Sequence, residues 1–188
     1  MFVFFRLFGS KNKRKFAKFI EINLETIKKN AVLREDQNYR FRSFLKGQDS
    51  KQLDRLVHDL YKRVVDQIDC TQCANCCIEL ETSFKMDEID RLAESSIIEK
   101  ERFIAELTNP DADGEKDIVW LKNQPCHFLK DKKCTIYPLR PGECQRYPYL
   151  YKSQIIQRLY GVVSNYGICP IVYNVFELLK AKYMNRKF

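Results

Sequence analysis

CTQCANCC, residues 70–77, holds four of the chain's eight cysteines within eight positions. A C-x2-C step lets one turn of backbone direct two sulfurs toward a common point, and thiolates crowded this closely repel one another unless a cation or a covalent bond neutralises them. The sequence therefore predicts either a metal site or a set of disulfides. The candidate ligands are Cys70, Cys73, Cys76, Cys77, Cys126, Cys134, Cys144 and Cys169.

Composition favours metal over disulfides. A chain of 188 residues with 45% hydrophobic residues can bury a core without covalent cross-links. The opening MFVFFRLF contains Arg6, follows no basic stretch and precedes no Ala-x-Ala-like site, so it makes a poor secretory signal, and it is shorter than the roughly 20 apolar residues that span a bilayer. We therefore expect a reducing cytoplasm, where clustered cysteines hold metal.

The net charge of +8 is concentrated at the N-terminus. The first 20 residues contain no acid and six bases, which are Arg6, Lys11, Lys13, Arg14, Lys15 and Lys18. A run of this kind is usually a solvated helix face, and a contact with an anionic membrane or with nucleic acid is the alternative.

Apolar periodicity divides the chain into two parts. We expect residues 1–48 to form a basic helical N-terminal extension, and residues 49–188 to form the cysteine-cluster metal-binding domain. Apolar residues at three- and four-residue steps predict a helix from Lys51 to Ile68 that runs directly into Cys70, and another that closes the chain. The buried stripe of the closing helix is predicted to contain Val172, Val175, Phe176, Leu179 and Tyr183.

Short strands and helices are predicted between these long helices. Two-residue alternation predicts strands at 78–84 and 118–121, a hairpin over 126–137 that turns at 130–133, and a strand at 155–164. Helices are expected near Met86 and over 97–107. The fold class is therefore α+β, with a helical N-terminal part and a small cysteine-rich, metal-centred unit of short strands and a C-terminal helix.

The adjacency of Cys76 and Cys77 argues against a single small ion held by both. Neighbouring side chains point to opposite faces of a strand or about 100° apart on a helix, so two centres or one multi-metal cluster follow more naturally. Eight thiolates could fill two four-cysteine zinc sites, or could hold one iron-sulfur cubane and leave a second set. His127 could replace a cysteine, although exposure at a loop edge is the simpler expectation. Arg140 and Arg146 are the candidate cations beside the thiolates.

The order of the cysteine motifs resembles a known family. After CTQCANCC come Pro125-Cys126, Cys134-Thr-Ile-Tyr137, Arg140-Pro141-x2-Cys144, Tyr147-Pro148 and Cys169-Pro170. This series, over about residues 70–170, is similar to the YkgJ-type C-x2-C-x2-C-C cysteine-cluster family of zinc- or iron-chelating proteins. The resemblance implies a small metal-binding domain whose relatives include flagellin lysine N-methylases, for which an iron-sulfur centre is implied. Relatives often have glycine, arginine and glycine at the positions that are here Ala74, Gln145 and Ile171.

We expect a metal-binding protein that uses zinc or iron, with the flanking helices packing against the metal unit or docking a protein partner. The chain contains neither a dinucleotide fingerprint nor a phosphate loop, and the sequence identifies no catalytic residue. An iron-sulfur-dependent protein-lysine N-methyltransferase remains the alternative, and it depends on the resemblance alone.

Overall fold

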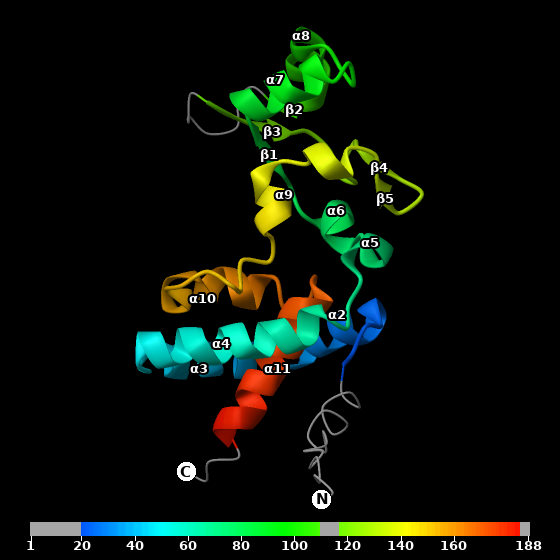
Figure 1. Cartoon of the computed structure of the whole chain (residues 1–188). Coiled ribbons are helices and arrows are strands. Elements are labelled where there is room, and N and C mark those ends of the chain that lie inside the picture. The colour runs from blue at the N-terminus through cyan, green and yellow to red at the C-terminus, as the bar shows by residue number, and fades with distance from the viewer. Residues whose placement is uncertain (1–19, 110–116, 185–188) are drawn as a thin grey trace, which may run out of the picture.

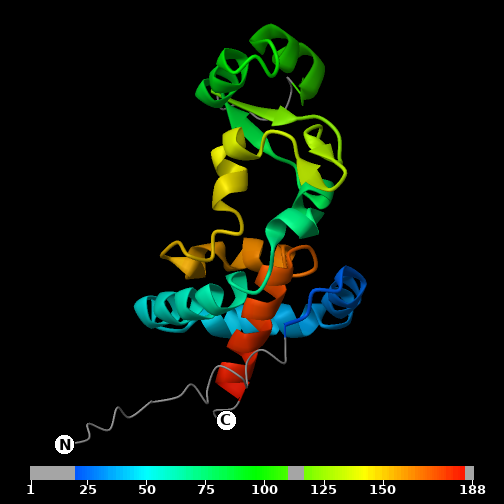
Figure 2. The ribbon, with the colours of Figure 1, turned by 45° about the vertical axis from the view of Figure 1, so that its right-hand side comes forward.

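The structure is a computed structural model that describes residues 20–109 and 117–184, and these form two lobes (Figures 1 and 2). Helices from both ends of the chain form one lobe, and the strands with the central helices form the other. Three short helices lie between the lobes: α5 (Cys70–Cys73), α6 (Asn75–Glu79) and α9 (Gly142–Arg146). The α+β fold class is confirmed. The basic run from Arg6 to Lys18, expected to be a solvated helix face with a contact to membrane or nucleic acid as the alternative, lies outside the described residues.

The helical lobe packs helices from the first 65 and the last 34 positions around one core. Its elements are α2 (Leu24–Leu33), α3 (Glu35–Lys46), α4 (Ser50–Val65), α10 (Ile155–Ser164) and α11 (Pro170–Met184). Ile27 of α2 and Leu45 of α3 are fully buried in the same core as α4 and α11. The helices on either side of the boundary expected between residues 48 and 49 therefore share one core. Among the described helices, none has both the length and the apolar character needed to cross a lipid bilayer.

The two long helices predicted from periodicity are confirmed as α4 and α11. Helix α4 begins after Asp49, whose side chain accepts a hydrogen bond from the backbone N–H of Gln52 at 2.8 Å. Its residues Leu53, Val57 and Leu60 recur every three or four positions and are buried against α11. The helix ends at Val65, three residues earlier than predicted, and leaves a short connection to the first cysteine.

The strand predicted at 155–164 is wrong, because these residues form α10. The carboxylate of Asp54 accepts hydrogen bonds from the backbone N–H groups of Gln154 and Ile155, at 2.7 and 2.9 Å, and so satisfies donors at the start of the helix. Ile155, Leu159 and Val163 then lie one turn apart and are buried in the core of the helical lobe. A contact across about 100 residues of sequence thus overrides the local strand preference of the β-branched residues.

The second lobe, here called the β lobe, is built on a three-stranded antiparallel sheet with strand order β1-β3-β2. Its elements are β1 (Ser83–Lys85), α7 (Met86–Glu94), α8 (Lys100–Arg102), the π-helical turn Phe103–Leu107, β2 (Thr108–Asn109), β3 (Ile118–Leu121), and the hairpin of β4 (Leu129–Lys130) with β5 (Lys133–Cys134). The predicted strand at 118–121, the helix near Met86 and the hairpin are confirmed, while the helix expected over 97–107 is split. The lobe has its own core, formed by Phe84, Ile89, Leu92, Phe103, Leu121, Phe128 and Ile136.

The strand predicted at 78–84 is wrong over its first half. The chain is helical to Glu79, where the N–H of Leu80 still donates to the carbonyl of Cys76 at 3.0 Å, and only Ser83–Lys85 pairs with β3. The buried side chain of Asn75 donates to the carbonyl of Ile168 at 2.7 Å and thereby holds the start of α6 against the segment before α11. This contact between distant segments supports a helical turn where the local alternation favours a strand.

Candidate metal centre

The cysteine stretch 70–77 forms two short helices between the lobes (Figure 1). Asp69 begins α5, because its side chain accepts from the backbone N–H of Thr71 at 2.9 Å. Ala74 then takes a left-handed conformation, with φ 52° and ψ 5°, and separates α5 from α6. Because of this break, Cys70 and Cys73 lie on one helix while Cys76 and Cys77 lie on the next.

The β lobe brings three distant cysteines to Cys77. The backbone N–H of Cys126 donates to the carbonyl of Cys77 at 2.8 Å, and Cys134 follows on the hairpin, where it pairs with Leu129. Cys144 comes from α9, and its sulfur lies 3.2 Å from the hydroxyl oxygen of Thr82. Cys126 interacts electrostatically with the other three thiols, as do Cys77, Cys134 and Cys144 among themselves. These four cysteines, Cys77, Cys126, Cys134 and Cys144, are called the hairpin set below.

The other four cysteines lie at the junction with the helical lobe. Cys169 directly precedes α11 and its sulfur accepts hydrogen bonds from the backbone N–H groups of Ile171 and Val172. Cys169 interacts electrostatically with both Cys70 and Cys76, and Cys70 interacts with Cys73. These four cysteines, Cys70, Cys73, Cys76 and Cys169, are called the junction set.

Two tyrosines that pack against the core of the helical lobe lie beside the junction set. The hydroxyl of Tyr147 donates to Asn165 Oδ1 at 2.9 Å and also forms a hydrogen bond with the Cys169 sulfur. Tyr61 interacts electrostatically with Cys70 and Cys169. Sequence reasoning missed Thr82, Asn75 and Tyr61 as neighbours of the thiols. Tyr147 stood in the motif Tyr147-Pro148, and Arg140 stood in the motif Arg140-Pro141.

Most of the thiols are held in the neutral form. Burial raises the pKa of Cys126 and of Cys169 to about 11, from an ordinary value of 9.0. In the adjacent pair, the hydrogen bond between the two sulfurs raises the pKa of Cys76 and lowers the pKa of Cys77 to about 7. Cys77 is therefore the thiol that loses its proton most readily, and a cation would have to displace protons from the others.

The donor chemistry suits a thiophilic metal, although the side chains are not preassembled around one. All eight cysteines are free, and thiolates are the ligands that zinc and iron-sulfur centres take in proteins. Within residues 20–109 and 117–184, no three Cys, His, Asp or Glu side chains are arranged so that they could hold an ion. Neutral thiols pair through hydrogen bonds, so ion binding requires deprotonation and rotation of side chains that are already neighbours.

The two arginines expected beside the thiolates lie in different surroundings. Arg140 interacts electrostatically with the thiols of Cys70, Cys77, Cys134 and Cys144, and its guanidinium lies 3.9 Å from the centre of the Tyr137 ring. It therefore provides positive charge to both sets.

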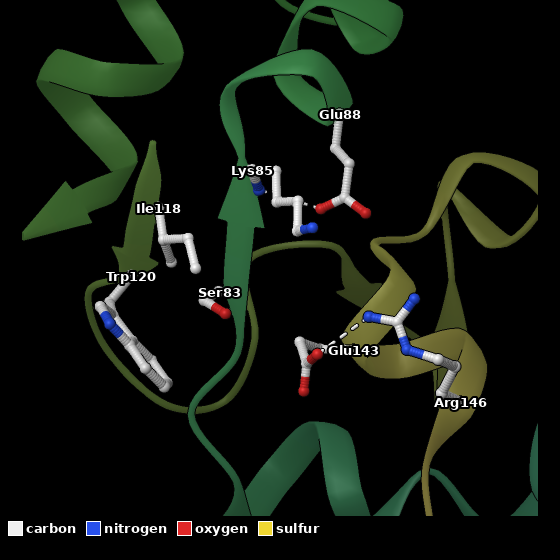
Figure 3. A pocket seen from close by; sticks show the side chains of 7 residues that line it. All are labelled: Ser83, Lys85, Glu88, Ile118, Trp120, Glu143 and Arg146. Atoms are coloured by element: carbon white, nitrogen blue, oxygen red, sulfur yellow. Dashed lines mark hydrogen bonds and ion pairs between the residues drawn. The ribbon is translucent and has the colours of Figure 1, made fainter. Parts of the chain in front are cut away.

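Arg146 instead forms an ion pair with Glu143 at 3.0 Å and packs against Gly142, where a Cβ atom would lie 2.5 Å from the guanidinium. Figure 3 shows it at the edge of a cleft of about 390 Å³ beside the outer face of β1 and β3, opposite Trp120. The positive charge of Arg146 is directed into this cleft and balanced by Glu143.

The structure assigns neither histidine to a group of candidate metal ligands within the described residues. His127 is exposed, and its ring packs edge-on against Phe128 with 5.2 Å between ring centres. His58 is half-buried on α4 in the helical lobe. The thiols are thus the soft donors that the structure brings together.

Comparison with known proteins agrees with the cysteine pattern. The family model CxxCxxCC, described as "putative zinc- or iron-chelating domain", matches residues 69–163. Neither a curated protein nor a solved structure matches the chain. The matched range contains seven of the eight cysteines and ends before Cys169.

Proposed function

The chain belongs to the CxxCxxCC family of zinc- or iron-chelating domains, and on this premise we propose that its eight cysteines bind the metal. The observation that carries the proposal is the gathering of thiols from four separate segments at one place between the lobes. Cys126 is hydrogen-bonded to the backbone of Cys77, and Cys169 interacts with Cys70 across nearly 100 residues of sequence. Free thiols drawn together from such distant segments fit metal chelation better than packing alone.

The energetics of the site support this function. Burial and the repulsion between neighbouring thiolates both disfavour the ionised sulfurs. A bound cation removes this penalty, because it neutralises several thiolates at once. A structural zinc site contributes on the order of 10 kcal/mol in small peptides, which is comparable to the stability of a whole domain. The small core of the β lobe is the part of the molecule that gains most from such a contribution.

An iron-sulfur centre is the second candidate for the same thiols. The sulfurs of Cys126 and Cys134 accept hydrogen bonds from the backbone N–H groups of Phe128 and Ile136. Arg140 lies near Cys134 and Cys144 of the hairpin set and near Cys70 of the junction set. Hydrogen bonds to sulfur and nearby positive charge tune the potential of an iron-sulfur centre. The lysine N-methyltransferase alternative would require this centre, together with a methyl-donor site that remains without assigned residues.

Elemental analysis of protein purified without oxygen tests the proposal. We expect stoichiometric zinc or iron, and the visible spectrum separates the two because zinc-thiolate sites are colourless and iron-sulfur clusters absorb. The control is a variant with Cys77→Ser and Cys134→Ser together, which should hold less metal. Protein that is folded, fully reduced and free of both metals would overturn the proposal.

A further inference from the structure

We propose that the chain holds two separate metal centres, one in each set of four thiols, and that the division between them falls between Cys76 and Cys77. The inference rests on the proposed metal binding and adds the number of centres, the ligands of each and their different roles. Four thiolates per centre is the donor set of a tetrahedral zinc site, so the ligand of each set is a thiophilic divalent cation.

The hairpin set is closed on itself. In each of the six pairs among Cys77, Cys126, Cys134 and Cys144, a negative charge on one sulfur raises the pKa of the other, so the four thiols are neighbours. The backbone supports this grouping independently, because the N–H of Cys126 donates to the carbonyl of Cys77 at 2.8 Å and the N–H of Leu129 donates to the carbonyl of Cys126 at 2.9 Å. These four donors can surround one ion without help from the junction set only after they lose their protons and rotate, because no three donors of the described residues are arranged around an ion as they stand.

The junction set is linked through Cys169. Cys70 and Cys76 both interact with Cys169, and Cys73 interacts with Cys70. The hydrogen bond from Asn75 to the carbonyl of Ile168, at 2.7 Å, holds α6 beside the residue that precedes Cys169. This contact places the Cys76 end of the cysteine stretch at the start of α11.

The geometry of α6 explains why neighbouring cysteines serve different centres. Successive side chains on a helix diverge by about 100°, so the Cα–Cβ bonds of Cys76 and Cys77 point in different directions. Their two sulfurs are hydrogen-bonded to each other and must separate when each binds its own ion. Cys77 carries the carbonyl that binds Cys126, while Cys76 interacts with Cys169. The two sets meet at Cys76, whose sulfur is hydrogen-bonded to Cys77 and lies near Cys144.

The two centres would stabilise different parts of the molecule. The hairpin set draws its ligands from α6, α9 and the segment around β4 and β5, so a cation there stabilises the β lobe (Figure 2). The junction set joins α5 and α6 to the first residue before α11, so a cation there ties the cysteine stretch to the core of the helical lobe. Loss of one cation should therefore leave the other bound.

Single-site variants of the full chain test the division. The metal-free protein is titrated with zinc and the bound ions are counted by native mass spectrometry, with Cys134→Ser for the hairpin set and Cys73→Ser for the junction set. We expect two zinc ions on the unchanged chain, one on each variant and none on the double variant. Hydrogen exchange should show that Cys134→Ser loosens the hairpin while Cys73→Ser does not.

A second measurement avoids the need for the variants to fold. The unchanged chain receives increasing amounts of zinc, free thiols are alkylated, and protection of each cysteine is read from its peptides. Protection should rise in two groups of four that match the two sets. Protection of all eight together, or groups that mix the sets, would overturn the division while leaving metal binding intact. A chain that binds neither zinc nor iron would instead overturn the proposed function.

Discussion

At the level of single residues, the conformation of Ala74 decides how the cysteine stretch is laid out. Its left-handed backbone separates the helix of Cys70 and Cys73 from the helix of Cys76 and Cys77. A residue with a Cβ atom loses roughly 1–2 kcal/mol in this conformation, whereas glycine adopts it freely. The family resemblance implies glycine at this position, and the left-handed backbone of Ala74 is the conformation that favours glycine.

We expect Ala74→Gly to stabilise the protein. The gain should be about 0.5–1 kcal/mol, because relief of the left-handed conformation exceeds the added freedom of the unfolded chain. The matched control is Ala181→Gly on the exposed face of α11, which should cost about 1 kcal/mol as glycine does inside a helix. Thermal unfolding of both variants in one buffer checks the signs, and destabilisation by both would show that Ala74 is not strained.

The thiols make the stability of the metal-free protein depend on pH. The pKa values of Cys126 and Cys169 are raised by burial from 9.0 to about 11 in the folded state. A group with a raised folded-state pKa stabilises the fold below its unfolded-state pKa, and this contribution is lost as pH rises through the folded-state value. We expect the unfolding temperature of the metal-free protein to fall between pH 9 and pH 11.

The zinc-loaded protein is the control for this pH series, because thiolates bound to a cation have already lost their protons. Its unfolding temperature should fall less over the same range, under the same reducing conditions. Equal losses in both forms would mean that the thiols do not cause the effect.

At the level of elements, the contact of Asn75 connects the cysteine helices to the helical lobe. The side chain is 3% exposed and its amide nitrogen donates to the Ile168 carbonyl at 2.7 Å. If the Asn75 amide is removed, the partly buried carbonyl of Ile168 loses this hydrogen bond. The contact thus couples the position of α6 to the start of α11.

We expect Asn75→Ala to destabilise the protein by about 1–3 kcal/mol, the range for a buried polar group that loses its partner. It should also weaken zinc binding by the junction set, because α6 is no longer held beside Cys169. Gln72→Ala, at an exposed position of α5, is the control and should change neither property. Thermal unfolding and competition with a chelator measure both effects; an unchanged affinity in Asn75→Ala would show that the tether does not organise the site.

The elements differ in how far the sequence alone could predict them. Helices α4 and α11 were predictable because apolar residues recur every three or four positions and so indicate which face is buried, as Leu53, Val57 and Leu60 do in α4. Helix α10 was not, since its isoleucines and valines favour a strand locally and its first N–H groups depend on Asp54, a residue far away in sequence. The division of the cysteines was also hidden, because the contact between Cys126 and Cys77 joins residues nearly 50 positions apart.

At the level of the whole molecule, the two lobes depend differently on the cysteines. The helical lobe has a large apolar core. Among the described residues, Cys169 is the one cysteine in that core. It also contains a buried polar network in which Lys180 donates to Glu177 at 2.7 Å and to Asn38. The β lobe has a smaller core of seven buried residues, with Cys126 and Cys134 packed against its edge.

We expect removal of metal by a chelator to loosen the β lobe first. The helical lobe retains its core without metal, whereas the small core of the β lobe depends on the cross-links of the hairpin set. Hydrogen exchange before and after chelation should show loss of protection in β1, β3 and the hairpin, and little change in α4 and α11. A uniform loss across both lobes, or no loss in either, would contradict this.

X-ray absorption at the metal edge of the anaerobically purified protein tests the central claim most directly, because it reports which atoms surround the bound metal. We expect a shell of sulfur alone, with metal-sulfur distances of about 2.3 Å if the metal is zinc. A shell dominated by nitrogen or oxygen would contradict the account, since it would mean that the gathered cysteines do not hold the metal.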